Sequence, residues 1–205
     1  MRTLIAIPCM DQVPAPFAQS LAMLTKVGEV RLAMQMGSLI YTSRNALAQQ
    51  AIQSDCDYIL WLDSDMVFDP DFLNRMLMQA KATKSPILTA LYHRRVPPYS
   101  PVLFRSIEME DGKCKWSEFD EIPPHPFTVA ACGFGGVLMD TEVVLSVMGK
   151  FNQLFEPINR AGEDIAFCWR ARECGYDILC DPAIEMGHVG YQIIDKRYYK
   201  KAREA

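Results

Sequence analysis

In the first half of the sequence, short apolar runs alternate with segments that have helical periodicity. Apolar residues recur at helical spacing after Pro16, after Ser43, which we expect to cap its helix, and after the pair Asp69 and Pro70, which we expect to begin another. Alternation of this kind is typical of a layered α/β fold with a mostly parallel sheet, whose ligands bind beyond the carboxyl ends of the strands. The runs with the composition of buried strands are "TLIAIP", "EVRLAMQ", "YILWL" and "PILTALY".

The second half has a different pattern. Two extended stretches flank Asp111-Gly112, which predicts a small β-hairpin insertion. The segment "FTVAACGFGGVLMD" predicts an apolar strand interrupted by glycines, "AGEDIAFCWRARECG" a helix that ends at Gly175, and "YDILC" and "AIEMGHVG" two late strands. Because no repeat or linker is evident, we expect a single domain over residues 1–205, with halves at 1–92 and 93–205.

Composition excludes several classes of protein. Half of the residues are hydrophobic and 22% are charged, which supports a packed core. The formal net charge of −4 does not indicate a broad basic surface, so nucleic acid is not an expected partner. Seven cysteines without a CxxC pair, and no signal peptide or membrane-spanning run, favour a cytoplasmic location. The basic tail "DKRYYKKAREA" is compatible with peripheral contact to an anionic membrane or with a solvated helix.

Two carboxylates, Asp63 and Asp65, follow the strand "YILWL" directly. Burial of two like charges without a counter-charge is costly. A divalent cation such as Mg²⁺ or Mn²⁺, shared with a diphosphate, would supply the positive charge. The alternative is a solvated turn, which we prefer for Asp69 and Asp71. For the strand-end pair we favour the metal site.

The stretch "SRNALAQQAIQSDCDYILWLDSDMVFDPDFLNRML" resembles the nucleotide-binding half of GT-A glycosyltransferases, especially those of the family 2 type, in which a DxD motif binds the metal and the nucleotide-sugar. The resemblance runs from "IAIPCMD" to "GEDIAFCWRARECGYDILCDPAIEMGHVG" and covers most of the chain. The DxD motif alone is not specific. Its combination with an "IAIP" strand, "SRN", an "ED" helix and a late histidine is much more so.

This resemblance implies a GT-A (Rossmann-like) α/β fold with a mixed, mostly parallel sheet flanked by helices. It also implies metal-dependent, inverting transfer of a sugar from a nucleotide-sugar to a hydroxyl acceptor such as a glycan, lipid or protein. UDP-sugars are the expected donors because the family uses them most.

The resemblance also assigns the residues of a donor site. Asp65 would be the principal metal ligand, with Asp63 on the ribose or the metal, and His188 of "EMGHVG" would complete the metal site. The alternative for the histidine is a hydrogen-bonded structural role near a strand end. The remaining nucleotide-binding candidates are Pro8, Asp11, Ser64 and Arg44.

Arg44 and the segment "YHRRVPP" allow two interpretations each, and a glycine-rich segment matches the family that the chain resembles. In "TSRNAL", the Arg44 guanidinium could pair with the nucleotide or diphosphate, or form a surface ion pair. The glycines within residues 133–136 resemble the glycine-rich acceptor-side segment of this family, which implies a close approach of the backbone to the sugar. The segment "YHRRVPP" either lines the mouth of the active site or is a solvated loop; its candidates are His93, Arg94 and Arg95.

Glu163 and Asp164 occupy the expected first turn of a helix, where the helix dipole alone favours anions. In the family that the chain resembles, an acidic residue of the "ED" motif is the general base that deprotonates the acceptor hydroxyl. We assign this role to Asp164 and orientation of the acceptor to Glu163, although the two roles are exchangeable.

Two other functions are compatible with parts of the sequence. The segment "LDSDMV" fits the nucleophile motif of haloacid-dehalogenase-like magnesium-dependent phosphatases, with Asp63 as nucleophile and Asp65 as acid/base. In those proteins the motif follows the first strand, whereas here it follows more than one strand–helix unit. The second alternative is a non-catalytic sugar-nucleotide-binding protein, because little sequence follows His188 to build an acceptor region.

Overall fold

A computed structural model of the protein describes residues 1–110, 112–190, 193–194 and 196. A central sheet of seven strands forms within these residues, and it is mixed. β1 pairs in parallel with β2 and β3, and β5 with β11, whereas β10 lies antiparallel between β3 and β5. The expected mixed α/β class is confirmed. In spatial order the strands are β2 (Glu29–Met36), β1 (Arg2–Cys9), β3 (Tyr58–Leu62), β10 (Gly136–Asp140), β5 (Ile87–Leu91), β11 (Ile178–Glu185) and β8 (Phe127–Val129).

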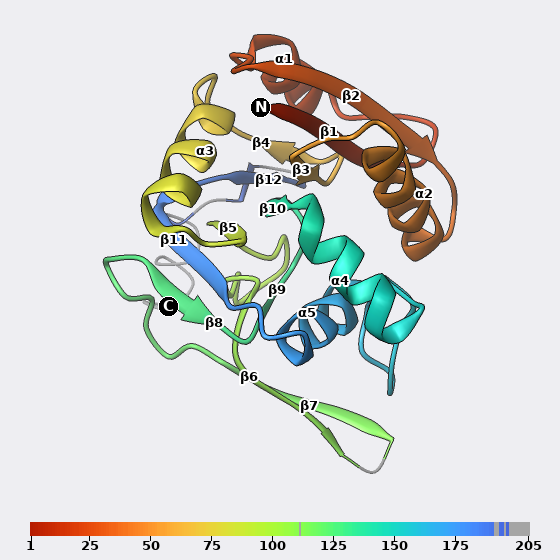
Figure 1. Ribbon diagram of the computed structural model, residues 1–205. Coiled ribbons are helices and arrows are strands. Elements are labelled where there is room, and N and C mark those ends of the chain that lie inside the picture. Colours follow the sequence, from red (N-terminus) through yellow and green to blue (C-terminus); the bar gives the residue numbers. More distant parts are fainter. Residues whose placement is uncertain (111, 191–192, 195, 197–205) are drawn as a thin grey trace.

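Helices cover both faces of this sheet (Figure 1). The alternation of side chains along a strand explains the two layers, because Leu60 and Leu62 of β3 pack with one set of helices, and Ile59 and Trp61 with the other. The first set is α1 (Ala15–Met23) and α3 (Phe72–Thr83). The second is α2 (Ile40–Gln53), α4 (Thr141–Phe151) and α5 (Glu163–Glu173).

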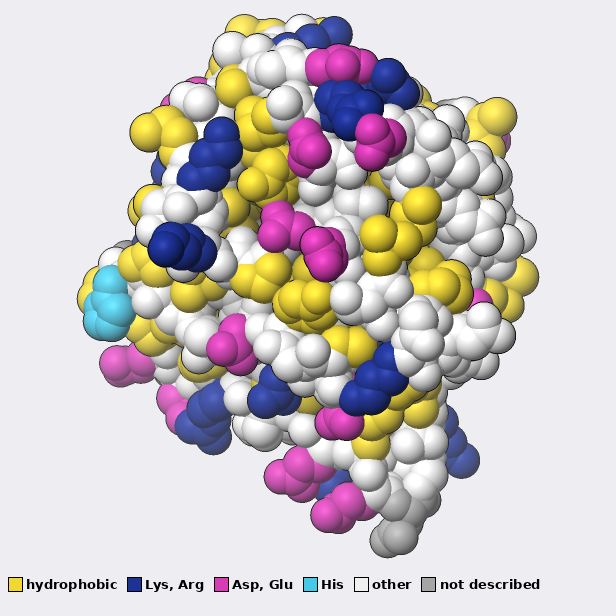
Figure 2. All heavy atoms as spheres, viewed as in Figure 1, with side chains coloured by type: hydrophobic (Ala, Val, Ile, Leu, Met, Phe, Trp, Pro, Cys, Tyr) yellow, Lys and Arg dark blue, Asp and Glu magenta, His cyan; other side chains and the backbone are white. Residues whose placement is uncertain are grey.

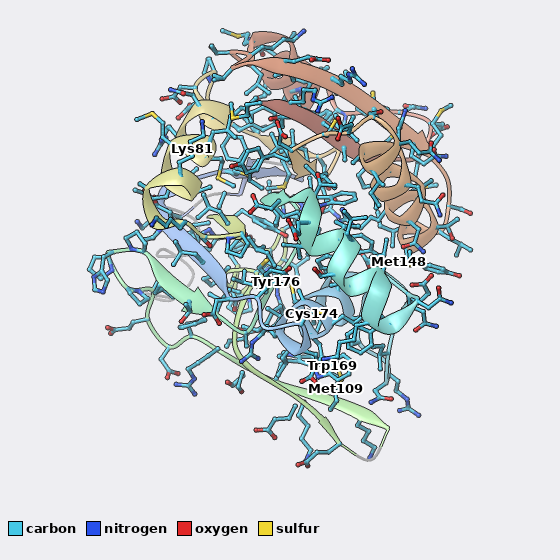
Figure 3. All side chains as sticks on the ribbon, viewed as in Figure 1. Lys81, Met109, Met148, Trp169, Cys174 and Tyr176 are labelled. Atoms are coloured by element: carbon cyan, nitrogen blue, oxygen red, sulfur yellow. The ribbon has the colours of Figure 1, made fainter. Side chains whose placement is uncertain are left out.

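Two smaller sheets complete the fold. β6 (Leu103–Glu110) and β7 (Lys113–Glu118) form the expected hairpin, which projects from the body and pairs with β9 (Ala131–Cys132) (Figure 1). The other small sheet consists of β4 (Met66–Val67), β12 (Gly187–Val189) and β13 (Ile193–Ile194). Partly buried side chains near α4, α5 and the hairpin pack against the core on this face of the sheet: Met109, Met148, Trp169, Cys174 and Tyr176 (Figure 3).

Two helix starts differ from the sequence-based expectation. α2 begins at Ile40 rather than after Ser43, so Leu39 is the N-cap and the buried Ser43 lies in the first turn, where its N–H donates to the Leu39 carbonyl. α3 begins at Phe72, because a turn in which Phe72 N–H donates to the Asp69 carbonyl comes first. The N-caps are therefore Leu39 and Asp71, and neither makes a side-chain cap hydrogen bond.

The structure differs more from the sequence-based expectation in the region after the hairpin. The segment "FTVAACGFGGVLMD" forms three short strands, β8, β9 and β10, in two sheets, rather than one interrupted strand. Helix α4 follows β10 directly and was not predicted. The two expected late strands are instead a single long strand, β11, followed by β12. Apart from Lys196, the tail expected as a terminal helix lies outside the described residues.

Figure 2 shows acidic and basic side chains close together on the face that it presents. Seven cysteines lie within the described residues, and each of them is a free thiol. None of the helices in the described ranges combines the length and the hydrophobicity needed to span a bilayer.

Candidate active site

A cavity of about 340 Å³ lies at the carboxyl ends of β1 and β3. The sheet order explains the location, because loops that leave parallel strands meet at the same edge. Asp11 and Asp164 are not among the lining residues, whereas the other predicted site residues are. Those that line the cavity are Pro8, Arg44, Asp63, Ser64, Asp65, Glu163 and His188.

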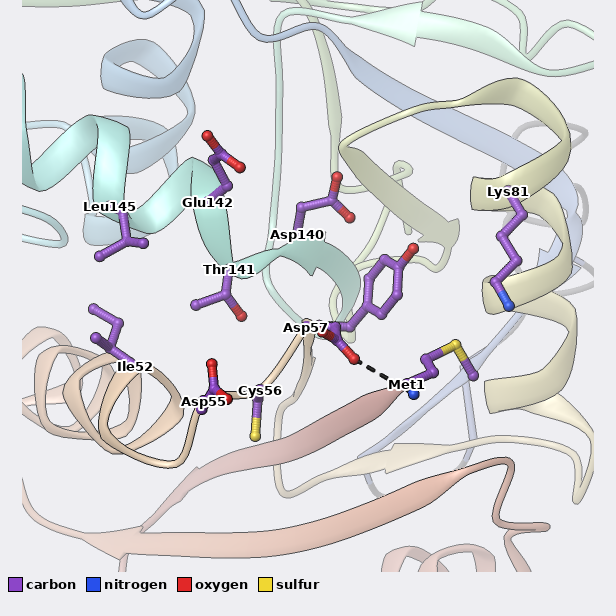
Figure 4. A pocket seen from close by; sticks show the side chains of 11 residues that line it. Met1, Ile52, Asp55, Cys56, Asp57, Lys81, Asp140, Thr141, Glu142 and Leu145 are labelled. Carbon is purple, nitrogen blue, oxygen red and sulfur yellow. Dashed lines mark ion pairs between the residues drawn. The ribbon is translucent and has the colours of Figure 1, made fainter.

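A larger cavity, of about 570 Å³, lies at the opposite ends of the strands (Figure 4). Its walls include Asp57, whose carboxylate lies 3.6 Å from the amino group of Met1 and accepts a hydrogen bond from the backbone of Arg2. None of the predicted site residues lines it. Ligands of α/β sheets bind beyond the carboxyl ends of the strands, so the smaller cavity is the better candidate for an active site.

Arg44 of α2 lies beneath the smaller cavity and is only 2% exposed. Its Nη2 donates to Asp63 Oδ1 at 2.8 Å, and its Nε lies 3.4 Å from Glu163 Oε1. The guanidinium also lies 5.2 Å from the ring centre of Phe134 and 5.7 Å from that of Trp61. Arg44 thus forms an ion pair, as in one of its two interpretations, but it is buried rather than on the surface.

The charge of Arg44 is fixed by its neighbours. Burial alone would lower the pKa of Arg44, but the surrounding carboxylates, Asp63 foremost, hold that pKa above its usual value. The positive charge that balances Asp63 is thus an arginine. Arg44 also joins the end of β3 to the start of α5, two segments that are far apart in the sequence.

The next residue of the "SRN" segment, Asn45, has a related role that the sequence did not reveal. Its Nδ2 donates to Glu156 Oε1 at 2.8 Å, and its Oδ1 accepts the Phe155 N–H at 3.2 Å. These bonds fix the segment that precedes α5. Adjacent residues of α2 therefore hold both acidic segments of the site. The "SRN" segment itself was the available signal for this role.

Asp65 lies between two nitrogen-bearing side chains. Its Oδ2 is 2.8 Å from Arg95 Nη1 and 3.3 Å from His188 Nε2. Burial raises the pKa of Asp65, but His188 and Arg95 lower it by more, so its pKa lies below the usual value. The carboxylate is therefore ionised and faces the cavity.

The orientation of the His188 ring is set by a backbone carbonyl. Its Nδ1 lies 2.9 Å from the carbonyl oxygen of His93, which can only accept, so Nδ1 carries a proton. Nε2 consequently faces Asp65 with either a second proton or a lone pair. The hydrogen bond expected of a structural histidine is present, and it fixes the ring so that Nε2 faces the Asp65 carboxylate.

Asp63 is not part of this pair, because its carboxylate contacts Arg44. The described residues contain no cluster of three His, Cys, Asp or Glu side chains that could hold a metal ion. The three metal ligands expected from the sequence thus lie around one cavity but do not converge on one point. Asp65 and His188 do converge.

Glu163 and Asp164 begin α5 as expected, with Gly162 at the N-cap. Asp164 Oδ1 accepts a hydrogen bond from the Ile165 N–H at 2.7 Å. Burial, and then the neighbouring charge of Glu163, raise the pKa of Asp164 to about 6. A carboxyl group with a pKa near neutrality is suited to proton transfer.

The glycines of residues 133–136 are explained by side chains of the protein. A Cβ on Gly133 would lie 2.1 Å from Tyr92 Oη, and one on Gly136 would lie 2.1 Å from Met186 Sδ. The close approach expected toward a sugar is thus made toward the protein's own core. Asp63 N–H donates to the Gly135 carbonyl at 3.3 Å, which attaches this segment to the DxD segment.

Tyr92 is a buried residue that sequence analysis did not single out. Its hydroxyl accepts the Gly135 N–H at 3.2 Å, and its ring meets that of His188 edge-on, with 5.8 Å between ring centres. Burial raises the pKa of Tyr92 well above its usual value. Its place at the end of the apolar run "PILTALY" gave no sign of this contact.

The segment "YHRRVPP" combines both of its expected roles. Arg95 lines the cavity, whereas Arg94 turns away to pair with Glu118 of the hairpin at 2.9 Å. His93 is buried. One residue of the three is therefore at the mouth of the site.

Comparison with known proteins gives a likeness in fold. No protein-family model matches the chain, and no curated protein matches its sequence. The crystal structure of A197 from STIV aligns with a TM-score of 0.66 and 19% identity over 93% of this chain and 86% of A197. The crystal structure of GalNAc-T7 with UDP, GalNAc and Mn²⁺ aligns with a TM-score of 0.63 and 11% identity over 100% of this chain.

The alignment covers 47% of the GalNAc-T7 chain, so the protein spans about half of that neighbour's length. Identities this low bear on the fold alone. The expected GT-A-like arrangement, a mixed central sheet flanked by helices, is confirmed.

Proposed function

We propose that the protein is a metal-dependent glycosyltransferase that moves a sugar from a nucleotide-sugar to a hydroxyl acceptor on a glycan, lipid or protein. The observation that carries the proposal is the convergence of Asp65 Oδ2 and His188 Nε2, 3.3 Å apart, in a cavity at the carboxyl end of the sheet. The fold supports it, because GalNAc-T7 shares this fold and its structure contains UDP, GalNAc and Mn²⁺. A UDP-sugar is therefore the first donor to test.

Asp65 and His188 fit a divalent cation by their chemistry. One carboxylate and one imidazole suit Mn²⁺ well, and Mg²⁺ takes the carboxylate with diphosphate oxygens and water in the other positions. The His93 carbonyl orients the imidazole as a supporting group should. When bound, the cation would stabilise the charge that develops on the departing diphosphate.

The remaining lining residues would bind the nucleotide. Asp63, whose charge Arg44 balances and which lines the cavity, would bind the ribose. Pro8 and Ser64 line the same cavity, and Asp11 follows at the end of β1. We assign Pro8, Ser64 and Asp63 to the nucleotide because they line the cavity of the proposed cation site, and Asp11 because it follows the same end of β1.

Proton transfer falls to the start of α5. Asp164 would take the proton of the acceptor hydroxyl while the hydroxyl oxygen attacks the anomeric carbon from the side opposite the diphosphate, which inverts the configuration there. Glu163, held by Arg44, would orient the acceptor. The pKa of about 6 favours Asp164 for the proton-transfer role.

A donor screen tests the proposal. Release of the nucleoside diphosphate from a panel of nucleotide-sugars is measured with and without Mn²⁺. The proteins compared are the wild type, Asp65→Ala and Asp164→Asn, and circular dichroism is the control for folding. We expect metal-dependent release in the wild type and a loss of at least about 100-fold in both variants. Turnover of a simple phosphate ester in place of sugar transfer would support the phosphatase alternative. Metal-dependent stabilisation by UDP without turnover would support the sugar-nucleotide-binding alternative.

A further inference from the structure

Arg95 occupies a position that the proposed function does not use. It belongs to the loop between β5 and β6, and its Nη1 lies 2.8 Å from Asp65 Oδ2. The same oxygen faces His188 Nε2. A guanidinium therefore approaches the oxygen atom that the proposed cation would use.

Arg95 and a metal ion cannot share this oxygen at low energy. A divalent cation bound to Asp65 Oδ2 would sit about 2 Å from it, within a few ångströms of the guanidinium. Two positive groups at that separation repel each other strongly in a partly buried cavity. Binding of the cation therefore requires Arg95 to leave Asp65.

The release of Arg95 needs only a side-chain movement. The Arg95 side chain is 51% exposed, compared with 23% for Asp65, and ion pairs with one exposed partner are weak. The loop backbone is fixed independently, because Arg94 N–H donates to the Ser100 carbonyl and Val102 N–H donates to the Tyr92 carbonyl. The guanidinium can thus rotate away while the loop keeps its conformation.

We propose, on the basis of the function above, that Arg95 is the resident counter-ion of Asp65. It balances the carboxylate while the cation is absent, and it competes with a cation that arrives alone. When the cation arrives with a nucleoside diphosphate, the displaced guanidinium pairs with the diphosphate oxygens, a geometry that arginine favours. Metal and donor consequently bind as a pair.

The experiment measures Mn²⁺ binding to the full chain by electron paramagnetic resonance of free Mn²⁺, with and without UDP. The variants are Arg95→Ala, Arg95→Lys and the matched control Arg94→Ala, which removes the neighbouring arginine of the same loop, 39% exposed and paired with Glu118 instead. Without UDP, we expect Arg95→Ala to bind Mn²⁺ roughly three- to tenfold more tightly than the wild type. Arg95→Lys retains the charge, so its Mn²⁺ affinity should stay within twofold of the wild-type value. The same holds for Arg94→Ala.

With UDP present, we expect the wild type to bind Mn²⁺ more tightly than Arg95→Ala does. Arg95→Ala should bind the Mn²⁺–UDP pair roughly three- to tenfold more weakly, because one charge-assisted contact to the diphosphate is lost. An Arg95→Ala protein that binds Mn²⁺ alone no more tightly than the wild type would overturn the proposal. So would tighter binding of the pair.

Failure of the underlying function has a different signature. If wild type and Arg95→Ala both fail to bind Mn²⁺ even with UDP, the metal-dependent function is wrong, and the counter-ion role fails with it. If the wild type binds Mn²⁺ with UDP but Arg95→Ala shows no gain for Mn²⁺ alone, only the role of Arg95 is wrong. Thermal unfolding of each variant controls for folding.

Discussion

Arg44 and Asp63 form an ion pair whose two members differ sharply in exposure. The guanidinium is 2% exposed, whereas the carboxylate 2.8 Å away is 31% exposed and faces the cavity. A buried arginine of this kind stabilises only while it is paired, because an uncompensated buried charge is strongly destabilising. The pair therefore fixes the DxD segment before any ligand arrives.

Replacement of Arg44 should destabilise the protein. Arg44→Met leaves Asp63 and Glu163 without their shared counter-charge, and we expect the free energy of unfolding to fall by about 2–4 kcal/mol. Urea unfolding followed by circular dichroism measures this. Arg94→Ala, at a half-exposed ion pair, should change it by less than about 1 kcal/mol. Addition of Asp63→Asn to Arg44→Met should restore part of the loss, and absence of any restoration would argue against the coupling of the pair.

Asp164 should make stability depend on pH. Its folded pKa of about 6 is above the value of about 3.9 in an unfolded chain, so the folded state binds this proton more tightly. The free energy of unfolding should then fall as the pH rises from about 4 to about 6, by roughly 1–3 kcal/mol. Asp164→Asn should flatten this dependence and raise stability at pH 8. Asp71→Asn, at an exposed position, should reproduce the wild-type profile; the same profile in Asp164→Asn would contradict the assignment.

The same carboxyl should control catalysis if it is the base. The rate of sugar transfer should fall about tenfold per pH unit below an apparent pKa at or under about 6, since a bound cation nearby would lower the pKa further. Asp164→Asn should lower kcat at least about 100-fold while UDP binding is unchanged. Glu163→Gln should act mainly on the KM for the acceptor. A normal kcat in Asp164→Asn would move the base to Glu163.

His188 should determine metal affinity. His188→Ala removes one of two converging ligands, and we expect Mn²⁺ affinity in the presence of UDP to fall about 10- to 100-fold. Isothermal titration calorimetry gives the affinity directly. His125→Ala, at an exposed loop position, is the matched control. If His188→Ala and His125→Ala bound Mn²⁺ with equal affinity, the assignment of His188 as a metal ligand would be wrong.

Gly135 should not tolerate a methyl group. A Cβ there would lie 2.8 Å from Tyr92 Cζ and 3.1 Å from Met66 Sδ, so Gly135→Ala should lower the free energy of unfolding by about 1–3 kcal/mol. Gly149→Ala in α4 provides the contrast, because its Cβ meets nothing within 4 Å. That variant should be more stable by about 0.5–1 kcal/mol in thermal or urea unfolding. Similar effects of both changes would contradict the packing explanation.

The parts of the fold that could be predicted are those with a local signal. Buried strands such as "YILWL" and the periodicity of α3 and α5 identified the α/β layers. Most of the residues that the resemblance assigned to a donor site line one cavity. The antiparallel insertion of β10 and the short strands β8 and β9 could not be predicted, because strand pairing depends on contacts between distant segments.

The site also contains features with a local sequence signal and features that depend on contacts between distant residues. A carboxylate pair after a strand can be found by its position, but the burial of Arg44 depends on Asp63 and Glu163, which lie 19 and 119 residues away. The contact between Tyr92 and His188 depends on the packing of two distant strands. Local sequence patterns do not reveal contacts between residues that are this far apart in the chain.

Helix α2 has a mechanical consequence for the two acidic segments. Arg44 and Asn45 are consecutive residues of α2. Asp63 and the Glu156 segment that precedes α5 are therefore both attached to this one helix. A shift or rotation of α2 would therefore move the Asp63 and Glu156 segments together as long as these contacts hold.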